Sequence, residues 1–110
     1  MYSIEYDVSM YTILRTDEFA RWLDGLKDRM VRARLNTRLA KVARGLLGDV
    51  KPVGDGVFEM RENFGPGWRM YYTQKGDVIV IMLGGGDKGT QQADIAAAQK
   101  LAATIEEQAP

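Results

Sequence analysis

Three stretches in the second half of the chain carry the hydrophobic patterns of β-strands. Segments 57–63 and 68–73 alternate apolar and polar side chains, which predicts two strands with one apolar face each. Segment 78–83 is apolar throughout, which predicts a central strand covered on both faces. The glycine-containing segments 65–67 and 75–77 are typical of tight turns. We therefore expect three consecutive strands joined by two turns.

Helical periodicity flanks these strands on both sides. A short amphipathic helix is expected after Asp17, the predicted N-cap. Segment 28–47 predicts a longer second helix that ends at Gly48. Segment 91–107, with Thr90 as its N-cap, predicts a last helix with a modest apolar stripe.

The remaining segments predict one more strand and two irregular connections. Residues 2–14 are rich in β-forming side chains and are interpreted as an N-terminal strand. Pro52 and three glycines argue against a long regular element in 48–56. The glycine run in 84–91 lacks the GxxxxGK[ST] phosphate motif, so we interpret it as a strand end held open by glycines.

Composition narrows the chemistry available to the chain. Its 110 residues, 45% of them apolar, suit a single domain with one real core. The chain has neither Cys nor His, so it lacks thiolates and the commonest metal ligand and general base. Any acid–base catalysis must therefore come from Glu, Asp, Lys, Arg or Tyr. No signal peptide or membrane span is evident, which predicts a cytoplasmic protein.

The net charge of zero hides a basic centre between two acidic ends. Residues 1–28 carry 3 basic and 6 acidic side chains, and residues 76–110 carry 2 and 5. Residues 29–75 carry 10 basic and 4 acidic side chains, a net charge of +6. This distribution argues against indiscriminate nucleic-acid binding but permits a local polyanion site.

Two groups of polar side chains are candidates for such a site. Strand alternation places Glu59 and Arg61 on the same face of the first hairpin as Arg69 and Tyr71. That face is either solvated, with cross-strand ion pairs, or functional. The second helix carries basic side chains along one edge of its apolar stripe, which either flank the core or bind a phosphate chain or a partner: Arg34, Arg38, Lys41 and Arg44.

Four segments together resemble a known family. They are FARWLDGLKDRMVRARLNTRLAKV, GDVKPVGDGVFEMR, GPGWRMYY and GGGDKGTQQADI, in this order and at these separations. The combination resembles the RelE/ParE superfamily of bacterial toxins, and it is most similar to the HigB-like addiction module killer proteins. The resemblance implies a single α+β, microbial-ribonuclease-like domain over residues 1–110. Its N-terminal helices would pack on a twisted antiparallel sheet that a C-terminal helix closes.

The same resemblance implies a function and partners. RelE- and HigB-like toxins cut messenger RNA, usually on the ribosome, so the resemblance implies a reaction that needs no metal ion and no cofactor. A cognate antitoxin, in HigB-like systems commonly a helix-turn-helix HigA-like protein, holds them inactive and provides the contact with operator DNA. Two alternatives stay open: a ParE-like toxin that inhibits DNA gyrase, and an inactive remnant that only binds its antitoxin.

Site residues carry over from the family only in part. Arg69, in the Gly67-Trp68-Arg69 turn, matches the central phosphate-binding arginine. Lys88 corresponds to a basic residue that follows the third strand, Arg61 is a second phosphate contact, and Glu59 is a candidate base for the 2′-hydroxyl. The chain departs from many relatives because it has no histidine. The expected RNA-contacting set is completed by Arg34, Arg38, Lys41, Lys51, Tyr71 and Asp87.

Overall fold

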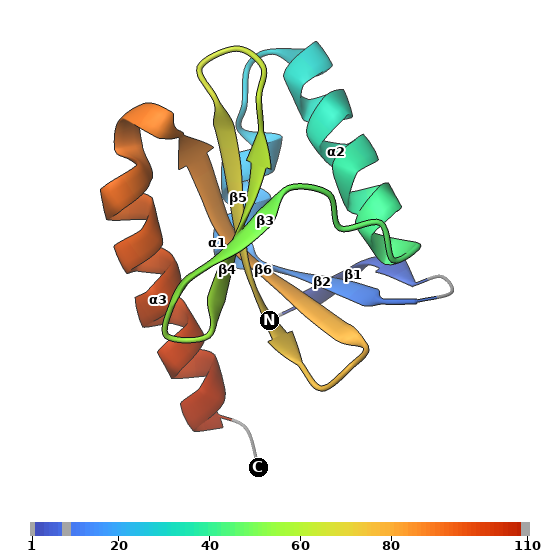
Figure 1. Ribbon diagram of the computed structural model, residues 1–110, viewed down its shortest axis with the longest axis vertical. Helices are drawn as coiled ribbons and strands as arrows, with labels where there is room; N and C mark the ends of the chain where they lie inside the picture. Colours follow the sequence, from blue (N-terminus) through green and yellow to red (C-terminus); the bar gives the residue numbers. More distant parts are fainter. Residues whose placement is uncertain (1, 8–9, 109–110) are drawn as a thin grey trace.

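A computed structural model describes residues 2–7 and 10–108. These residues form three α-helices, one short 3-10 turn and a six-stranded sheet in the order β1-β2-β6-β5-β4-β3 (Figure 1). The elements are β1 (Tyr2–Asp7), β2 (Thr12–Thr16), α1 (Asp17–Asp24), α2 (Arg29–Ala43), β3 (Val50–Gly54), β4 (Val57–Glu62), β5 (Trp68–Lys75), β6 (Ile79–Asp87), η1 (Lys88–Thr90) and α3 (Gln91–Gln108).

The three predicted strands are confirmed as β4, β5 and β6, joined in antiparallel order. β6 lies near the centre of the sheet, and its segment 80–83 is buried, as the apolar run predicted. β6 also runs further than expected, through the glycines to Asp87. The sheet is mixed rather than wholly antiparallel as the resemblance implied, because β2 pairs with β6 in parallel. The connection between these two strands contains both N-terminal helices and β3 to β5.

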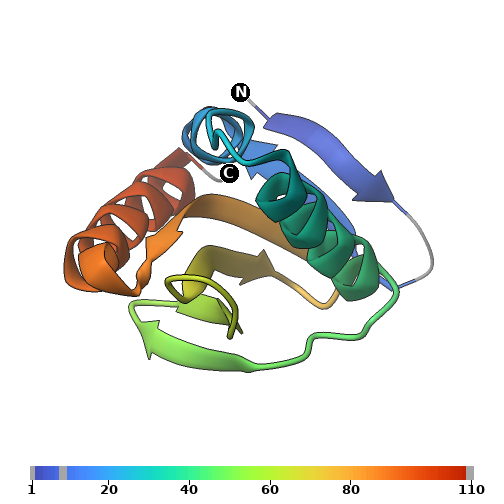
Figure 2. The same cartoon turned by 90° about the horizontal axis from the view of Figure 1, so that it is seen from above.

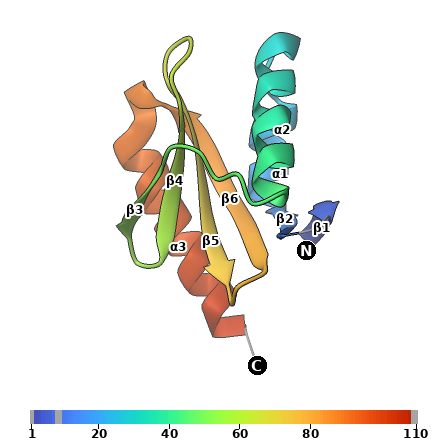
Figure 3. The ribbon, with the colours of Figure 1, turned by 45° about the vertical axis from the view of Figure 1, so that its right-hand side comes forward.

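Helices cover both faces of the sheet (Figures 2 and 3). Phe19 and Leu39, from α1 and α2, pack with Met82 in one buried cluster. Ala98 and Ile105 of α3 pack with Ile81 in a second cluster on the opposite face. This arrangement confirms the predicted α+β architecture with a closing C-terminal helix. Among the described residues, no helix is long and apolar enough to span a bilayer.

Two expectations about strands are wrong. Residues 2–14 do not form one strand, because β1 and β2 pair with each other as antiparallel neighbours. The connection 48–56 contains a five-residue strand, β3, that pairs with β4 at the edge of the sheet. Pro52 is tolerated there because the outer side of an edge strand needs no ladder donor.

The helix boundaries differ from the predictions because other side chains provide the caps. Thr16, not Asp17, caps α1, since its hydroxyl oxygen accepts from the backbone N–H of Phe19 at 3.1 Å. α2 ends at Ala43, four residues before its predicted end. Thr90 does not begin α3 as a simple N-cap; its hydroxyl donates to Asp94, and a 3-10 turn precedes the helix.

Trp68 lies on the apolar side of β5, as alternation predicted, and its ring packs against Trp22 with centroids 6.4 Å apart. Trp68→Ala is expected to lower the free energy of unfolding by about 2 kcal/mol, less than a fully buried aromatic because Trp68 is only partly buried. Urea denaturation measures this change. Val78→Ala, at a side chain that is 53% exposed, should cost less than about 0.5 kcal/mol. Equal effects would contradict the packing assigned to Trp68.

Candidate functional site

The predicted polar face of the first hairpin lies on the α3 side of the sheet. In the strand register, Glu59 of β4 stands opposite Tyr71 of β5, and Arg61 stands opposite Arg69. On the outer side of β4, Lys51 of β3 pairs with Glu59. The shared face is therefore confirmed.

This face is not solvated at its centre, because the first turn of α3 covers it. Glu59 is fully buried, and its Oε2 accepts hydrogen bonds from the Tyr71 hydroxyl at 3.1 Å and from the Gln91 side-chain amide at 2.8 Å. The solvated alternative for this face therefore does not hold at Glu59, and the equally complete burial of Tyr71 argues against its predicted contact with RNA. The alternation of apolar and polar residues correctly placed these side chains on one face of the sheet. It could not show that α3, which is distant in the sequence, covers that face.

Arg69 is the cation nearest to this buried carboxylate. It is 7% exposed, and its Nε lies 3.8 Å from Glu59 Oε1. Among the described residues, neither of these two atoms has a hydrogen-bond partner. Arg69 Nη1 donates to the carbonyl of Trp68 at 3.2 Å. Buried atoms without partners are rare in folded proteins and cluster at functional sites.

Arg69 and Lys88 both lie beside Gly67. A Cβ atom at Gly67 would lie 3.4 Å from Arg69 Nη1 and 3.5 Å from Lys88 Cβ. Gly67 also has a φ of 83°, which L side chains rarely adopt. The structure therefore brings the turn before β5 next to the 3-10 turn after β6, so that the Arg69 guanidinium and the base of the Lys88 side chain both lie beside Gly67.

The other predicted residues at this end of the sheet have different surroundings. Arg61 is partly exposed and binds the Asp49 carboxylate through Nε at 3.2 Å and Nη2 at 3.1 Å. Asp87 accepts from the backbone N–H of Gly89 at 2.7 Å and so shapes the 3-10 turn. Lys51 is exposed on the edge strand β3.

The basic side chains of α2 do not join this site, because α2 packs on the other face of the sheet. Arg38 is buried and bonds to main-chain carbonyls and Glu62, so the prediction that it contacts RNA is wrong. Arg34 stacks its guanidinium 3.7 Å from the centroid of the Phe64 ring. The two other predicted RNA contacts on this helix, Arg34 and Lys41, are exposed.

Residues 21–105 match the family model described as "Phage derived protein Gp49-like (DUF891)". The chain belongs to this Gp49-like family. The Gp49-like chain is also similar to an uncharacterized protein of Haemophilus influenzae, with 43% identity over 90 residues that cover 82% of this chain and 91% of the relative.

Among solved structures, the Gp49-like protein is similar to a chain of the toxin–antitoxin complex RelBE2 from Mycobacterium tuberculosis. The two share 24% identity with a TM-score of 0.57, over 73% of this chain and 100% of the other. At this identity the likeness shows the fold. The RelE-like fold predicted from the sequence is therefore confirmed.

Two residues of the Gp49-like site were not predicted from the sequence: Gln91, which binds Glu59, and Asp94. A Cβ atom at Gly86 would lie 1.9 Å from Asp94 Oδ2, so the Asp94 carboxylate packs against the strand backbone and any side chain at this position would displace it. The glycine run was the available signal for this approach. Nothing in the local sequence indicated Gln91, because its partner Glu59 is 32 residues away.

The pKa of the Tyr71 phenol is raised above its ordinary value, because the ring is buried and the Glu59 carboxylate lies beside it. The unfolded chain ionises its tyrosines near pH 10, so the neutral phenol favours folding below that pH and loses this contribution as pH rises. We expect the free energy of unfolding to fall between about pH 9 and 11. In Tyr71→Phe this fall should be shallower.

Urea unfolding at the two ends of this pH range measures the slope. Tyr2 and Tyr72 also have raised pKa values from burial, so part of the slope should persist in Tyr71→Phe. An identical slope in Tyr71→Phe and in the wild type would contradict the linkage to Tyr71.

Proposed function

We propose that this Gp49-like protein is the toxin of a type II toxin–antitoxin module, of the HigB-like branch, and an endoribonuclease that cleaves messenger RNA. The observation that carries the proposal is the juxtaposition of Arg69 and Lys88 around Gly67. Two cations at one sheet end are suited to a phosphate group. The RelE-like fold supports the reaction class by analogy.

The proposed reaction is attack of an RNA 2′-oxygen on the adjacent phosphorus. The new O–P bond forms as the bond to the 5′-oxygen breaks, which leaves a 2′,3′-cyclic phosphate and a 5′-hydroxyl. The 2′-hydroxyl loses its proton and the leaving 5′-oxygen gains one. Arg69 would stabilise the charge on the phosphorane oxygens, and Lys88 would neutralise the leaving oxygen. Arg61 would hold a neighbouring phosphate once it exchanges Asp49 for RNA.

Glu59 fits a positioning role better than that of a base. The carboxylate is fully buried, and Tyr71 and Gln91 already bind one of its oxygens. Its charge lies next to Arg69 and would fix the direction of the guanidinium. Acid–base assistance is worth about 10²–10⁴ in rate, so a site without an exposed base depends on other means to orient the RNA. The ribosome would orient the RNA for this attack.

The proposed partners are messenger RNA on the ribosome and a cognate antitoxin of the helix-turn-helix, HigA-like kind. The antitoxin would hold the toxin inactive and make the contact with operator DNA. A solved structure of this fold is a toxin–antitoxin complex, which supports a protein partner.

Primer extension on a reporter messenger RNA tests the activity in a bacterial translation extract. The reaction is run with the purified protein, with and without ribosomes. Specific cuts that require ribosomes are expected. Intact RNA combined with growth arrest in cells would contradict the nuclease and favour a gyrase-inhibiting toxin. Intact RNA without arrest would favour an inactive antitoxin-binding protein.

A further inference from the structure

The hydrogen bond between Gln91 and Glu59 joins the start of α3 to a strand two places away in the sheet. Gln91 is the first residue of α3 and follows the 3-10 turn after β6, whereas Glu59 lies in β4. β5 runs between β6 and β4. The Gln91 side-chain amide donates to Glu59 Oε2 at 2.8 Å, so this bond crosses β5 on the face that carries Arg69.

This bond helps to determine which oxygen of Glu59 faces Arg69. Oε2 accepts from both Gln91 and the Tyr71 hydroxyl, so the carboxylate cannot rotate without losing two hydrogen bonds. Oε1 has no hydrogen-bond partner among the described residues, and it lies 3.8 Å from Arg69 Nε. In the same part of the chain, no other cation pairs with Glu59. The orientation of this buried carboxylate therefore acts mainly on the Arg69 guanidinium.

Gln91 is also connected to the turn that carries Lys88. Lys88 is the first residue of η1, and Gln91 follows the last residue of that turn. Asp87 shapes the turn from its other end, because its Oδ1 accepts from the backbone N–H of Gly89 at 2.7 Å. A turn this short leaves little freedom between its two ends. Fixing Gln91 on the sheet therefore also fixes the position of Lys88.

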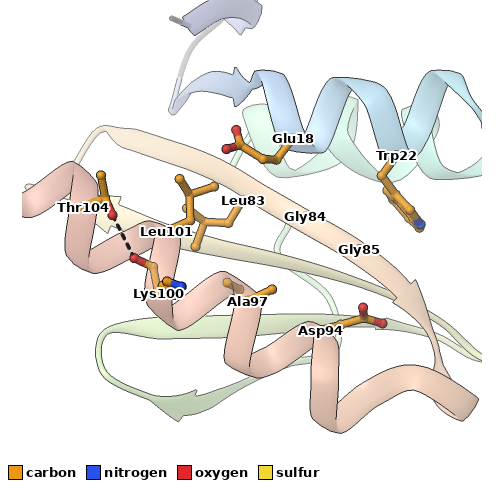
Figure 4. Close-up of a pocket in the computed structure, with 11 residues that line it drawn as sticks. Glu18, Trp22, Leu83, Gly84, Gly85, Asp94, Ala97, Lys100, Leu101 and Thr104 are labelled. Atoms are coloured by element: carbon orange, nitrogen blue, oxygen red, sulfur yellow. Dashed lines mark hydrogen bonds between the residues drawn. The ribbon is translucent and has the colours of Figure 1, made fainter.

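The first turn of α3 packs on β6 beside Arg69. Gly86 is the partner of Arg69 in the register of β5 and β6. Asp94 projects from α3 toward β6 (Figure 4), and its Oδ2 would lie 1.9 Å from a Cβ atom at Gly86. The Thr90 hydroxyl donates to the same carboxylate oxygen. The start of α3 thus contacts the sheet on both sides of Arg69, at Gly86 of β6 and at Glu59 of β4.

We propose that Gln91 is a positioning residue for the phosphate site. It orients the Arg69 guanidinium through Glu59, and it places Lys88 relative to Arg69 through η1. The inference rests on the proposed function for the reaction that this site performs. Gln91 does not touch the RNA; its amide orients a buried carboxylate, and that carboxylate orients the cation that meets the phosphate. Donors held in place in advance need no reorganisation during the reaction.

Gln91→Met is the variant that tests this role. Methionine is unbranched and a good helix former, but its thioether cannot donate a hydrogen bond and adds no charge. The Tyr71 hydroxyl remains bound to Glu59 Oε2, so the variant is expected to fold. Gln92→Met makes the same change at the next residue, which is exposed, and is the matched control. Urea midpoints of both variants show whether folding is affected.

The Nε proton of Arg69 reports the positioning without any RNA. Its exchange with solvent is measured by NMR on the full chain, and it should be slow in the wild type because Nε is buried. In Gln91→Met the exchange should be at least about tenfold faster, while the backbone amides of β5 keep their protection, because the change is local. Gln92→Met should match the wild type. Equally slow exchange of this proton in Gln91→Met would overturn the proposal.

RNA cleavage in the translation extract provides the second measurement. At saturating ribosome concentration, the rate constant of Gln91→Met should fall by about 10–10²-fold, since a small misplacement of a reacting group has costs of this size. The ribosome concentration that gives half the maximal rate should stay unchanged, because Gln91 does not contribute to binding. A loss confined to that concentration, or cleavage at the wild-type rate, would overturn the proposal.

Failure of this inference is distinguishable from failure of the nuclease. If the wild type cuts no RNA, the proposed function falls, and exchange of the Arg69 Nε proton still decides whether Gln91 positions this side chain. If the wild type cuts RNA and Gln91→Met cuts it equally well, the nuclease stands and the positioning role of Gln91 falls.

Discussion

Arg69→Ala is expected to lower the rate of RNA cleavage by about 10²–10³-fold, the usual cost of losing one donor that stabilises transition-state charge. Arg69 is the cation closest to the buried Glu59 carboxylate, and it lies with Lys88 beside Gly67. Arg69 Nε has no hydrogen-bond partner among the described residues, and a bound phosphate would complete the bonding of this guanidinium. Primer extension in the translation extract measures the loss.

Two further variants separate catalysis from folding. Arg69→Ala leaves the Glu59 charge with less compensation, so its urea midpoint must be measured alongside its activity. Arg69→Lys keeps the charge but loses the planar fork, and it should also be impaired. Arg29→Ala, an exposed arginine on α2, should cut RNA like the wild type. A folded Arg69→Ala protein with normal cleavage would remove Arg69 from the site.

The fold was predictable where one local pattern determines one element. The uniform apolar run of 78–83 predicted a strand covered on both faces, and residues 80–83 lie buried between the two helical layers, whereas Val78 before the strand is exposed. The β1–β2 pair was not predictable in the same way, because 2–14 has β-forming side chains on both sides of the break. The edge strand β3 was missed because Pro52 and glycines dominate its local signal, while pairing with β4 determines its conformation.

Strand alternation predicted which face of the sheet the site residues lie on, and nothing more about the site. Alternation placed Glu59 and Arg69 on one face, and the register confirms it. Whether that face is open depends on α3, which arrives from far along the sequence, and on Gln91 in particular. The same limit applies to Arg38: its helical position suggests an exposed edge, but the loop after α2 folds over it.

Arg38 joins that loop to the sheet. Its guanidinium donates to the carbonyls of Leu47 at 2.8 Å, Asp49 at 3.0 Å and Arg61 at 2.9 Å, and it pairs with Glu62. Three main-chain acceptors and a carboxylate thus depend on one side chain that is 8% exposed. Because unsatisfied buried groups keep their full desolvation cost, this arginine is expected to be a large contributor to stability.

Arg38→Ala is accordingly expected to lower the free energy of unfolding by about 3–5 kcal/mol, the range for breaking a buried charge pair. Arg38→Lys should recover only part of this, because one ammonium cannot reach carbonyls that a planar fork reaches together. Lys41→Ala, at an exposed position on the same helix, is the control and should change stability by less than about 0.5 kcal/mol. Urea denaturation measures all three. If Arg38→Ala were as stable as Lys41→Ala, the arginine would not hold the loop, and a surface role in binding RNA would again be the better interpretation of its charge.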